Sequence, residues 1–211
     1  MIVQAEEMAR AVRVAIDMNR GDEPLIVEGD TDTLTLDEII YAKLADAVRL
    51  VEMEAPLFML ESGHDFGDDN VFIGVDGKGF VVLPEDFMRL ICFRMSDWGR
   101  CVYEAISEGD PRYALQSSRF RGICGNAEKP VVAIVRRAEG KVLEFYSCRD
   151  DRATVAQASY LPLPGIDRDG GIDVAGDCYR AAVYRAASLA LASVGDQLST
   201  TMLEISKSLL Q

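Results

Sequence analysis

Histidine is nearly absent from this 211-residue chain, which has one, His64. Nucleophilic systems built on a Ser-His or Cys-His pair would all depend on this residue, and no motif around it supports them. The five cysteines are odd in number and contain no C-x-x-C pair, so no zinc-ligand spacing is present. We therefore expect no metal and no cofactor. Two or three of the cysteines fall on apolar strand positions, which predicts reduced, buried cysteines of the kind typical of cytosolic proteins.

Long apolar runs are also missing. No stretch approaches the roughly 20 apolar residues that a helix needs to cross a bilayer, so we expect no membrane contact. The first 20 residues are amphipathic and include Glu6 and Glu7, which argues against a signal peptide. No glycine-rich phosphate loop is present either, because Gly74–Gly79 reads as a hairpin turn with no helix after it.

Basic clusters are absent although the chain is strongly charged. The net charge is −13, and residues 1–70 hold 17 acidic and 5 basic residues, against 18 and 17 in the remainder. One interpretation is a solvated acidic surface on N-terminal helices; another is an acidic channel wall that repels the phosphate backbone of passing DNA. Both exclude a conventional nucleic-acid-binding module, which needs a contiguous basic surface.

Helical periodicity is clearest at the two ends of the chain. Apolar spacing predicts helices over residues 4–18 and 35–55, and the second begins with a capping box, Thr35 followed by Glu38. Residues 178–194 and 196–210 form a predicted helical hairpin broken at a glycine. The first helix of this pair is alanine-rich on nearly every face, so we expect it to be packed on both sides inside a bundle.

Strand-like segments fill the middle of the chain. They are predicted at residues 71–75, 79–83, 88–95, 101–106, 130–136, 141–147 and 155–161, with a short helix within 110–121. Residues 165–177 are rich in glycine and aspartate and predict a connector. The predicted fold is therefore α+β: a helical bundle from N-terminal helices (1–62) and a C-terminal helix pair (166–211), with an inserted, mostly antiparallel β domain (63–165).

A series of short motifs follows this arrangement in a fixed order. The motifs are Ala55-Pro56-Leu57, Leu83-Pro84-Glu85-Asp86-Phe87-Met88-Arg89-Leu90, Asp97-Trp98, Lys129-Pro130-Val131-Val132-Ala133, Leu143-Glu144-Phe145-Tyr146 and Tyr160-Leu161-Pro162. With this order, residues 35–211 resemble the head-to-tail connector (adaptor or ring) proteins of tailed phages, especially those of crAss-like phages. The motifs are structural, so the resemblance brings no active site with it.

The resemblance implies a structural virion protein that is not an enzyme. It would be made in the host cytoplasm and located in the neck or tail region of the virion. Many copies, commonly twelve in that family, would form a ring below the portal protein and contact other tail or ring proteins. The ring would extend the DNA channel, and genomic DNA would pass through it without sequence-specific binding. Heterologous contacts between neighbouring copies would close such a ring.

Candidate interface residues are of two kinds. Trp98 could be an exposed interface anchor, although a position in the core or at a β-sheet edge fits it at least as well. The apolar stretch at the end of the chain supplies the other candidates, Leu203, Ile205, Leu209 and Leu210.

Two other classes of function stay open. One is a small cytosolic enzyme or a ligand-binding or metal-binding α+β protein. The other is a regulatory module that dimerises through its last two helices. Candidate chemistry for the first class comes from acidic residues: a loop with Asp65, Asp68, Asp69 and Asn70, the Asp30-Thr31-Asp32 segment, and the Glu85-Asp86 pair. The loop and the segment lack the spacing of known calcium loops, and adjacent carboxylates on a turn usually point apart.

Overall fold

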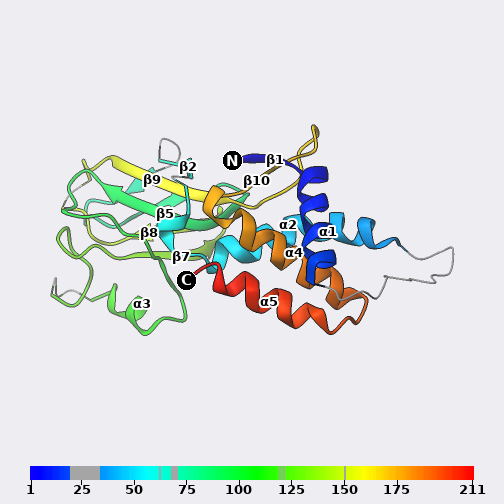
Figure 1. Cartoon of the computed structure of the whole chain (residues 1–211). Coiled ribbons are helices and arrows are strands. Elements are labelled where there is room, and N and C mark those ends of the chain that lie inside the picture. The colour runs from blue at the N-terminus through cyan, green and yellow to red at the C-terminus, as the bar shows by residue number, and fades with distance from the viewer. Residues whose placement is uncertain (20–33, 62, 68–70, 119, 121, 150) are drawn as a thin grey trace. The chain divides into compact units, whose positions relative to one another are not determined.

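The computed structural model describes residues 1–19, 34–61, 63–67, 71–118, 120, 122–149 and 151–211 (Figure 1). It confirms a mixed α+β fold, with five α-helices in the described residues. The chain divides into two compact units. The helical unit contains Met1–Glu61 and Pro164–Gln211, and the β unit contains Ser62–Leu163. The sequence places these boundaries after residues 62 and 165.

The helical unit contains four of these α-helices and a two-stranded ribbon. The helices are α1 (Ala5–Asn19), α2 (Leu36–Glu54), α4 (Tyr179–Ser193) and α5 (Leu198–Ser208). The ribbon pairs β1 (Ile2–Gln4) antiparallel with β10 (Gly171–Asp173). Two 3-10 turns are also present, η1 (Leu57–Met59) after α2 and η2 (Gly176–Cys178) before α4. The prediction of a plain connector over 165–177 is wrong at β10, because a three-residue strand is too short to show alternation.

The predicted capping box forms at the start of α2. Thr35 Oγ1 accepts a hydrogen bond from the Glu38 backbone N–H (3.3 Å), and the Glu38 carboxylate accepts one from the Thr35 N–H (2.7 Å). The Thr35 hydroxyl also donates to this carboxylate (2.8 Å), and the bonds from the Thr35 backbone and then from its side chain lower the pKa of Glu38. Two of the four N–H groups that a helix leaves unpaired at its start are satisfied in this way.

The alanine-rich helix α4 lies inside the helical unit, as its composition predicts. Five of its alanines are completely buried: Ala181, Ala182, Ala186, Ala187 and Ala190. α1, α2 and α5 all pack against α4. Small side chains allow helix axes to approach closely, so one helix can contact three others without leaving voids.

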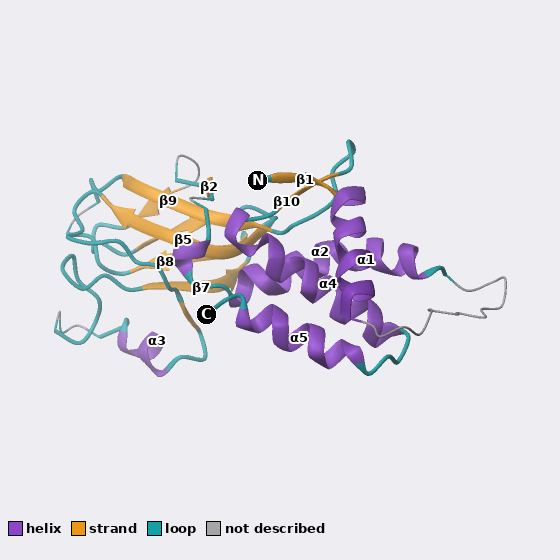
Figure 2. Ribbon diagram, viewed as in Figure 1, coloured by secondary structure: helices purple, strands orange, loops and turns teal. Residues whose placement is uncertain are grey.

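The β unit contains two sheets and one short helix (Figure 2). The first sheet has the strand order β2 (His64–Asp65), β9 (Val155–Pro162), β5 (Phe87–Met95) and is antiparallel. The second has the order β3 (Val71–Ile73), β4 (Gly79–Val82), β8 (Gly140–Phe145), β7 (Val132–Arg137), β6 (Ile106–Ser107). Its pairs are antiparallel except β6 with β7, which is parallel. The helix α3 (Pro111–Leu115) follows β6.

The predicted strand at 101–106 is wrong over most of its length. Val102 makes one isolated antiparallel bridge, to Phe93, and ladder pairing starts again only at Ile106. An isolated bridge needs only one favourable residue pair, whereas a strand needs a run of alternating residues. The apolar pattern of residues 101–106 alone could not distinguish a full strand from an isolated bridge.

Aromatic side chains dominate the core of the β unit. Phe87 and Leu90 of β5 are 2% and 5% exposed. Phe87 stacks on Tyr160 of β9 with ring centroids 5.5 Å apart, and Phe66 packs edge-to-face on both rings. Aromatic pairs of this kind stabilise a core beyond the area that they bury.

The hairpin between β3 and β4 depends on Gly77. Its φ of +76° is unfavourable for residues with a side chain, and a Cβ there would lie 2.1 Å from the Cys148 carbonyl oxygen. The Cys148 N–H also donates to the Gly77 carbonyl (3.1 Å). The Asp76-Gly77 turn, read correctly from the sequence, is thus also a tertiary contact.

Candidate interaction surfaces

Trp98 lies in the core of the β unit and is 2% exposed. Its ring packs edge-to-face on Phe93 (5.6 Å between centroids) and Phe145 (6.3 Å). Trp98 is therefore not an exposed anchor, and the core alternative is the one that the structure has. The core position is favoured because tryptophan has a large apolar side chain, and packing it against these two rings removes that apolar surface from water.

The four candidates at the end of the chain divide between core and surface. Leu210 is buried, and Leu209 packs partly buried against the helical core. Leu203 and Ile205 of α5 are partly exposed. The buried face of α5 is instead formed by Met202 and Ser206, and Ser206 Oγ donates to the Ala181 carbonyl (2.8 Å). Leu203 and Ile205 are therefore the two candidates that could reach a partner.

Exposed apolar side chains that the sequence did not single out occur in both units. In the helical unit, Phe58 and Met18 are each 80% exposed. In the β unit, Val75 is 87% exposed and Phe120 is 73% exposed. Single exposed apolar residues are common on proteins, and they indicate a contact surface only where several lie together.

One of these surfaces is an aromatic and arginine stack on the outer face of the five-stranded sheet. Phe72 of β3 stacks on Phe80 of β4 with centroids 4.8 Å apart, and the Arg137 guanidinium lies 4.7 Å from the Phe80 ring centre. The three groups border an open groove of about 620 Å³ that also includes Glu144 and Tyr146. Phe72 is half exposed, so one aromatic face remains available at the surface.

Glu144 organises the polar side of this groove. It is 5% exposed and accepts hydrogen bonds from Arg137 Nε (2.7 Å), from the Tyr113 hydroxyl (3.2 Å) and from the Tyr146 hydroxyl. The pKa values of both tyrosines are raised, first by burial and then by their interactions with Glu144. Because the carboxylate is paired with arginine and both tyrosines stay protonated, this cluster fixes α3 to the sheet and suits recognition better than proton transfer.

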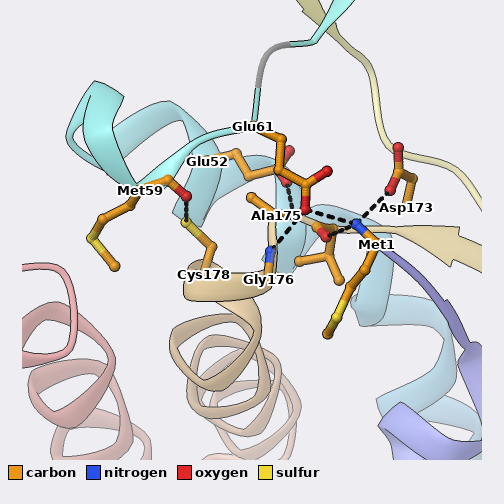
Figure 3. A network of polar contacts seen from close by, with 9 residues as sticks. Met1, Glu52, Met59, Glu61, Asp173, Ala175, Gly176 and Cys178 are labelled. Carbon is orange, nitrogen blue, oxygen red and sulfur yellow. Dashed lines mark hydrogen bonds and ion pairs between the residues drawn. The ribbon is translucent and has the colours of Figure 1, made fainter.

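A second polar network lies in the helical unit, between α2 and the start of α4 (Figure 3). Glu52 accepts a hydrogen bond from the Ala175 N–H (2.9 Å). Glu61 accepts one from the Gly176 N–H (3.3 Å) and one from the amino group of Met1 (3.1 Å), which also pairs with Asp173 (3.2 Å). Carboxylates placed at these N–H groups satisfy donors at the entry to η2 and α4.

Glu52 is a buried acid whose ionisation opposes folding. Burial raises its pKa above the ordinary value of 4.5; the Ala175 N–H partly offsets this, and the nearby Asp173 adds to it. The folded protein therefore binds a proton more readily than the unfolded chain, so the free energy of unfolding falls as pH rises through the interval above 4.5.

Replacing Glu52 with glutamine is expected to stabilise the helical unit at neutral pH. The amide oxygen can still accept from the Ala175 N–H, while the cost of burying a charge is removed. Urea unfolding at neutral pH and near pH 4.5 measures the effect: the advantage of the variant should shrink at the lower pH. Asp46→Asn, on the exposed face of the same helix, is the matched control and should show no such change. Equal pH dependence in Glu52→Gln and wild type would contradict the assignment.

The other candidate residues do not gather into a reactive site. His64 in β2 is exposed and contacts the Tyr160 ring edge-to-face (5.9 Å). Asp86 accepts a hydrogen bond from the Tyr160 hydroxyl (2.9 Å); burial first, and then this bond, raise the pKa of that tyrosine to about 12. The Asp30–Asp32 segment and Asp68–Asn70 of the proposed calcium loop lie outside the described residues. In the part of the chain that is described, no group of three or more His, Cys, Asp or Glu residues is placed to hold a metal ion.

Across the described ranges, no helix is both long enough and apolar enough to span a membrane. A comparison with protein-family models and a comparison with curated proteins both find no match to the chain.

Proposed function

We propose that this chain is a structural virion protein: a head-to-tail connector that forms a ring below a phage portal and extends the DNA channel. The observation that carries the proposal is the order of the parts. Both ends of the chain contribute to the helical unit, and the segment between them makes up the β unit. In the finer form of the proposal, the helices form one bundle into which a mostly antiparallel β domain is inserted, as in the connectors that the sequence resembles.

The distribution of charge supports this role. The helical unit holds 20 acidic and 9 basic residues, whereas the β unit holds 15 and 13. An acidic surface repels the phosphate backbone and so lets DNA slide past without binding, as a channel wall requires. Genomic DNA is accordingly a passing cargo in this proposal and not a ligand.

The exposed apolar side chains supply the contacts that a ring needs. A closed ring with heterologous contacts requires two different surfaces on each copy, and both units present large apolar side chains to solvent. Leu203 and Ile205 are the proposed contacts of α5 with a portal or ring partner, because they are partly exposed while their neighbours Met202 and Ser206 are buried.

Co-expression with a tailed-phage portal protein, followed by negative-stain microscopy and mass photometry, tests the proposal. We expect rings of fixed copy number, about twelve by the resemblance, seated on the portal. Changing Leu203 and Ile205 together to aspartate should weaken assembly about five- to thirtyfold, because about 1–2 kcal/mol of apolar contact is lost at a central interface position. Thr201→Asp, at an exposed position of the same helix, is the matched control and should assemble normally.

Three outcomes would count against the proposal. If the chain stays monomeric in the presence of the portal at high concentration, the proposed ring assembly is wrong. A tight dimer without portal binding would favour a regulatory module. Thermal stabilisation by calcium that is lost on Asp68→Ala with Asp69→Ala would favour a metal-binding domain.

A further inference from the structure

The strand β3 forms one edge of the five-stranded sheet in the β unit, where it pairs only with β4. Edge strands leave backbone N–H and carbonyl groups unpaired, and proteins usually protect them with a charged residue, a proline or a bulge. The stretch from Val71 to Val75 contains no charge and no proline, and the pairing of β3 with β4 has no register shift. Phe72 and Val75 are both more than half exposed. β3 is therefore an edge without the usual protection against a further strand.

The register of the β3–β4 hairpin shows which backbone groups of β3 face outwards. The Gly74 N–H donates to the Lys78 carbonyl (2.7 Å), so these two residues form a hydrogen-bonded pair next to the turn. Hydrogen-bonded and non-hydrogen-bonded pairs alternate along an antiparallel ladder, so the next hydrogen-bonded pair is Phe72 with Phe80. The N–H and carbonyl groups of Phe72 therefore point to β4, and those of the residues on either side of it point away from the sheet.

Val71 and Ile73 carry these outward groups. Both residues are partly exposed, and in the described part of the chain neither makes a backbone hydrogen bond outside its own hairpin. Because they flank Phe72 symmetrically, an antiparallel strand of the same sequence would place each Val71 opposite an Ile73. The edge is thus self-complementary, as a contact about a two-fold axis requires.

The side chains and charges of the hairpin also suit a second copy of this chain. Phe72 stacks on Phe80 with one face of its ring and keeps the other face at the surface. Asp76 and Lys78 are the only charged residues within 71–82, and their charges cancel. Two copies that each carry a net charge of −13 repel one another overall, so a neutral, apolar surface is where they can meet at the lowest electrostatic cost.

We propose that β3 pairs with β3 of a second copy, antiparallel about a two-fold axis centred on Phe72. On each side of the axis, Val71 of one copy and Ile73 of the other would exchange N–H to carbonyl hydrogen bonds. The two Phe72 side chains would face each other as a non-hydrogen-bonded pair, in which opposing side chains lie closest. The five-stranded sheets of the two copies would then form one continuous sheet.

The small size of this contact sets its expected strength. Specific, stable interfaces bury about 1,600 Å² in total, far more than two strands of three residues provide. We therefore expect a weak, reversible dimer with a dissociation constant between about 10 µM and 1 mM. Such a dimer differs from the tight dimer expected of a regulatory module, and it uses neither α5 nor a portal protein.

Sedimentation velocity of the purified full chain, at concentrations up to about 1 mM, tests this inference. Phe72→Lys should raise the dissociation constant at least about tenfold, because two lysines would stand directly opposite each other. Phe72→Glu should have the same effect for the same reason. A mixture of the two variants should associate again, because lysine then faces glutamate. This rescue is expected only if residue 72 lies opposite residue 72 of the second copy.

A backbone variant and a matched control complete the design. Ile73→Pro removes an outward N–H that the β3–β4 ladder does not use, so it should weaken the dimer while the far-UV circular dichroism stays like that of wild type. Phe120→Lys makes the same change as Phe72→Lys at another exposed aromatic position of the β unit, and it should dimerise as wild type.

Three results would overturn the proposal: a wild-type chain that is monomeric at about 1 mM, a dimer that Phe72→Lys leaves unchanged, or a mixture of the two charged variants that stays monomeric. If Ile73→Pro folds poorly, the Phe72 variants decide, because they change only a half-exposed side chain. All of these measurements are made without a portal protein, so their failure leaves the proposed ring untouched.

Discussion

Replacing Trp98 with alanine is expected to lower the free energy of unfolding of the β unit by about 3–5 kcal/mol. The side chain is 2% exposed and packs against Phe93 and Phe145, so its removal leaves a cavity that these rings cannot fill without moving. The turn that carries it also donates from the Gly99 N–H to the Ala127 carbonyl (2.9 Å), which limits collapse of the site. Urea unfolding followed by far-UV circular dichroism is the measurement, because Trp98 is the only tryptophan and its fluorescence is lost in the variant.

Two further variants separate the cavity from other causes. Trp98→Phe keeps an aromatic ring and removes an indole N–H that is buried without a hydrogen-bond partner among the described residues, so it should cost clearly less. Phe58→Ala makes an aromatic-to-alanine change at a position that is 80% exposed, and it should stay within about 0.5 kcal/mol of wild type. A loss below about 1 kcal/mol for Trp98→Ala would contradict a core position.

The helices were the part of the fold that sequence could predict, because their signals are local. The Thr35 and Glu38 capping box fixes the start of α2, and the predicted helices agree with α1, α2, α4 and α5 to within a few residues. Alanine on all sides of a helix likewise has one simple explanation, burial on all sides. In each case, the residues that predict the helix lie within four or five positions of the helix residues that they determine.

The strands that were missed depend on contacts that are distant in sequence. β1 pairs with β10 through three residues on each side, Ile2–Gln4 with Gly171–Asp173, and nothing in either segment identifies the other. The position of Trp98 was ambiguous for the same reason. It stands between Asp97 and Gly99, whose polar surroundings suggest a surface turn, and only the packing of β5 and β8 residues over the indole places it inside.

The candidate surfaces were predictable only in part. Leu203 and Ile205 could be named as apolar residues of the last helix, but their separation from buried Leu210 depends on which face of α5 meets α4. The Glu144 cluster could not be found from sequence. It needs Tyr113 of α3, Arg137 of β7 and Tyr146 to meet at one carboxylate, and these residues come from three separate stretches of chain.

Replacing Ala186 with leucine is expected to destabilise the helical unit by about 1–3 kcal/mol or more, because the added side chain has no space. Ala186 is completely buried at the centre of α4, and α1, α2 and α5 all pack on this helix, so relief of the clash on one side creates another elsewhere. Leucine is nearly as good a helix former as alanine, so the loss would report packing and not helix propensity. Ala192→Leu makes the same change at an exposed position of the same helix and should stay within about 0.5 kcal/mol of wild type in urea unfolding. If both variants unfold like wild type, α4 tolerates bulk on every side, and the close approach of helices inferred from its alanines is wrong.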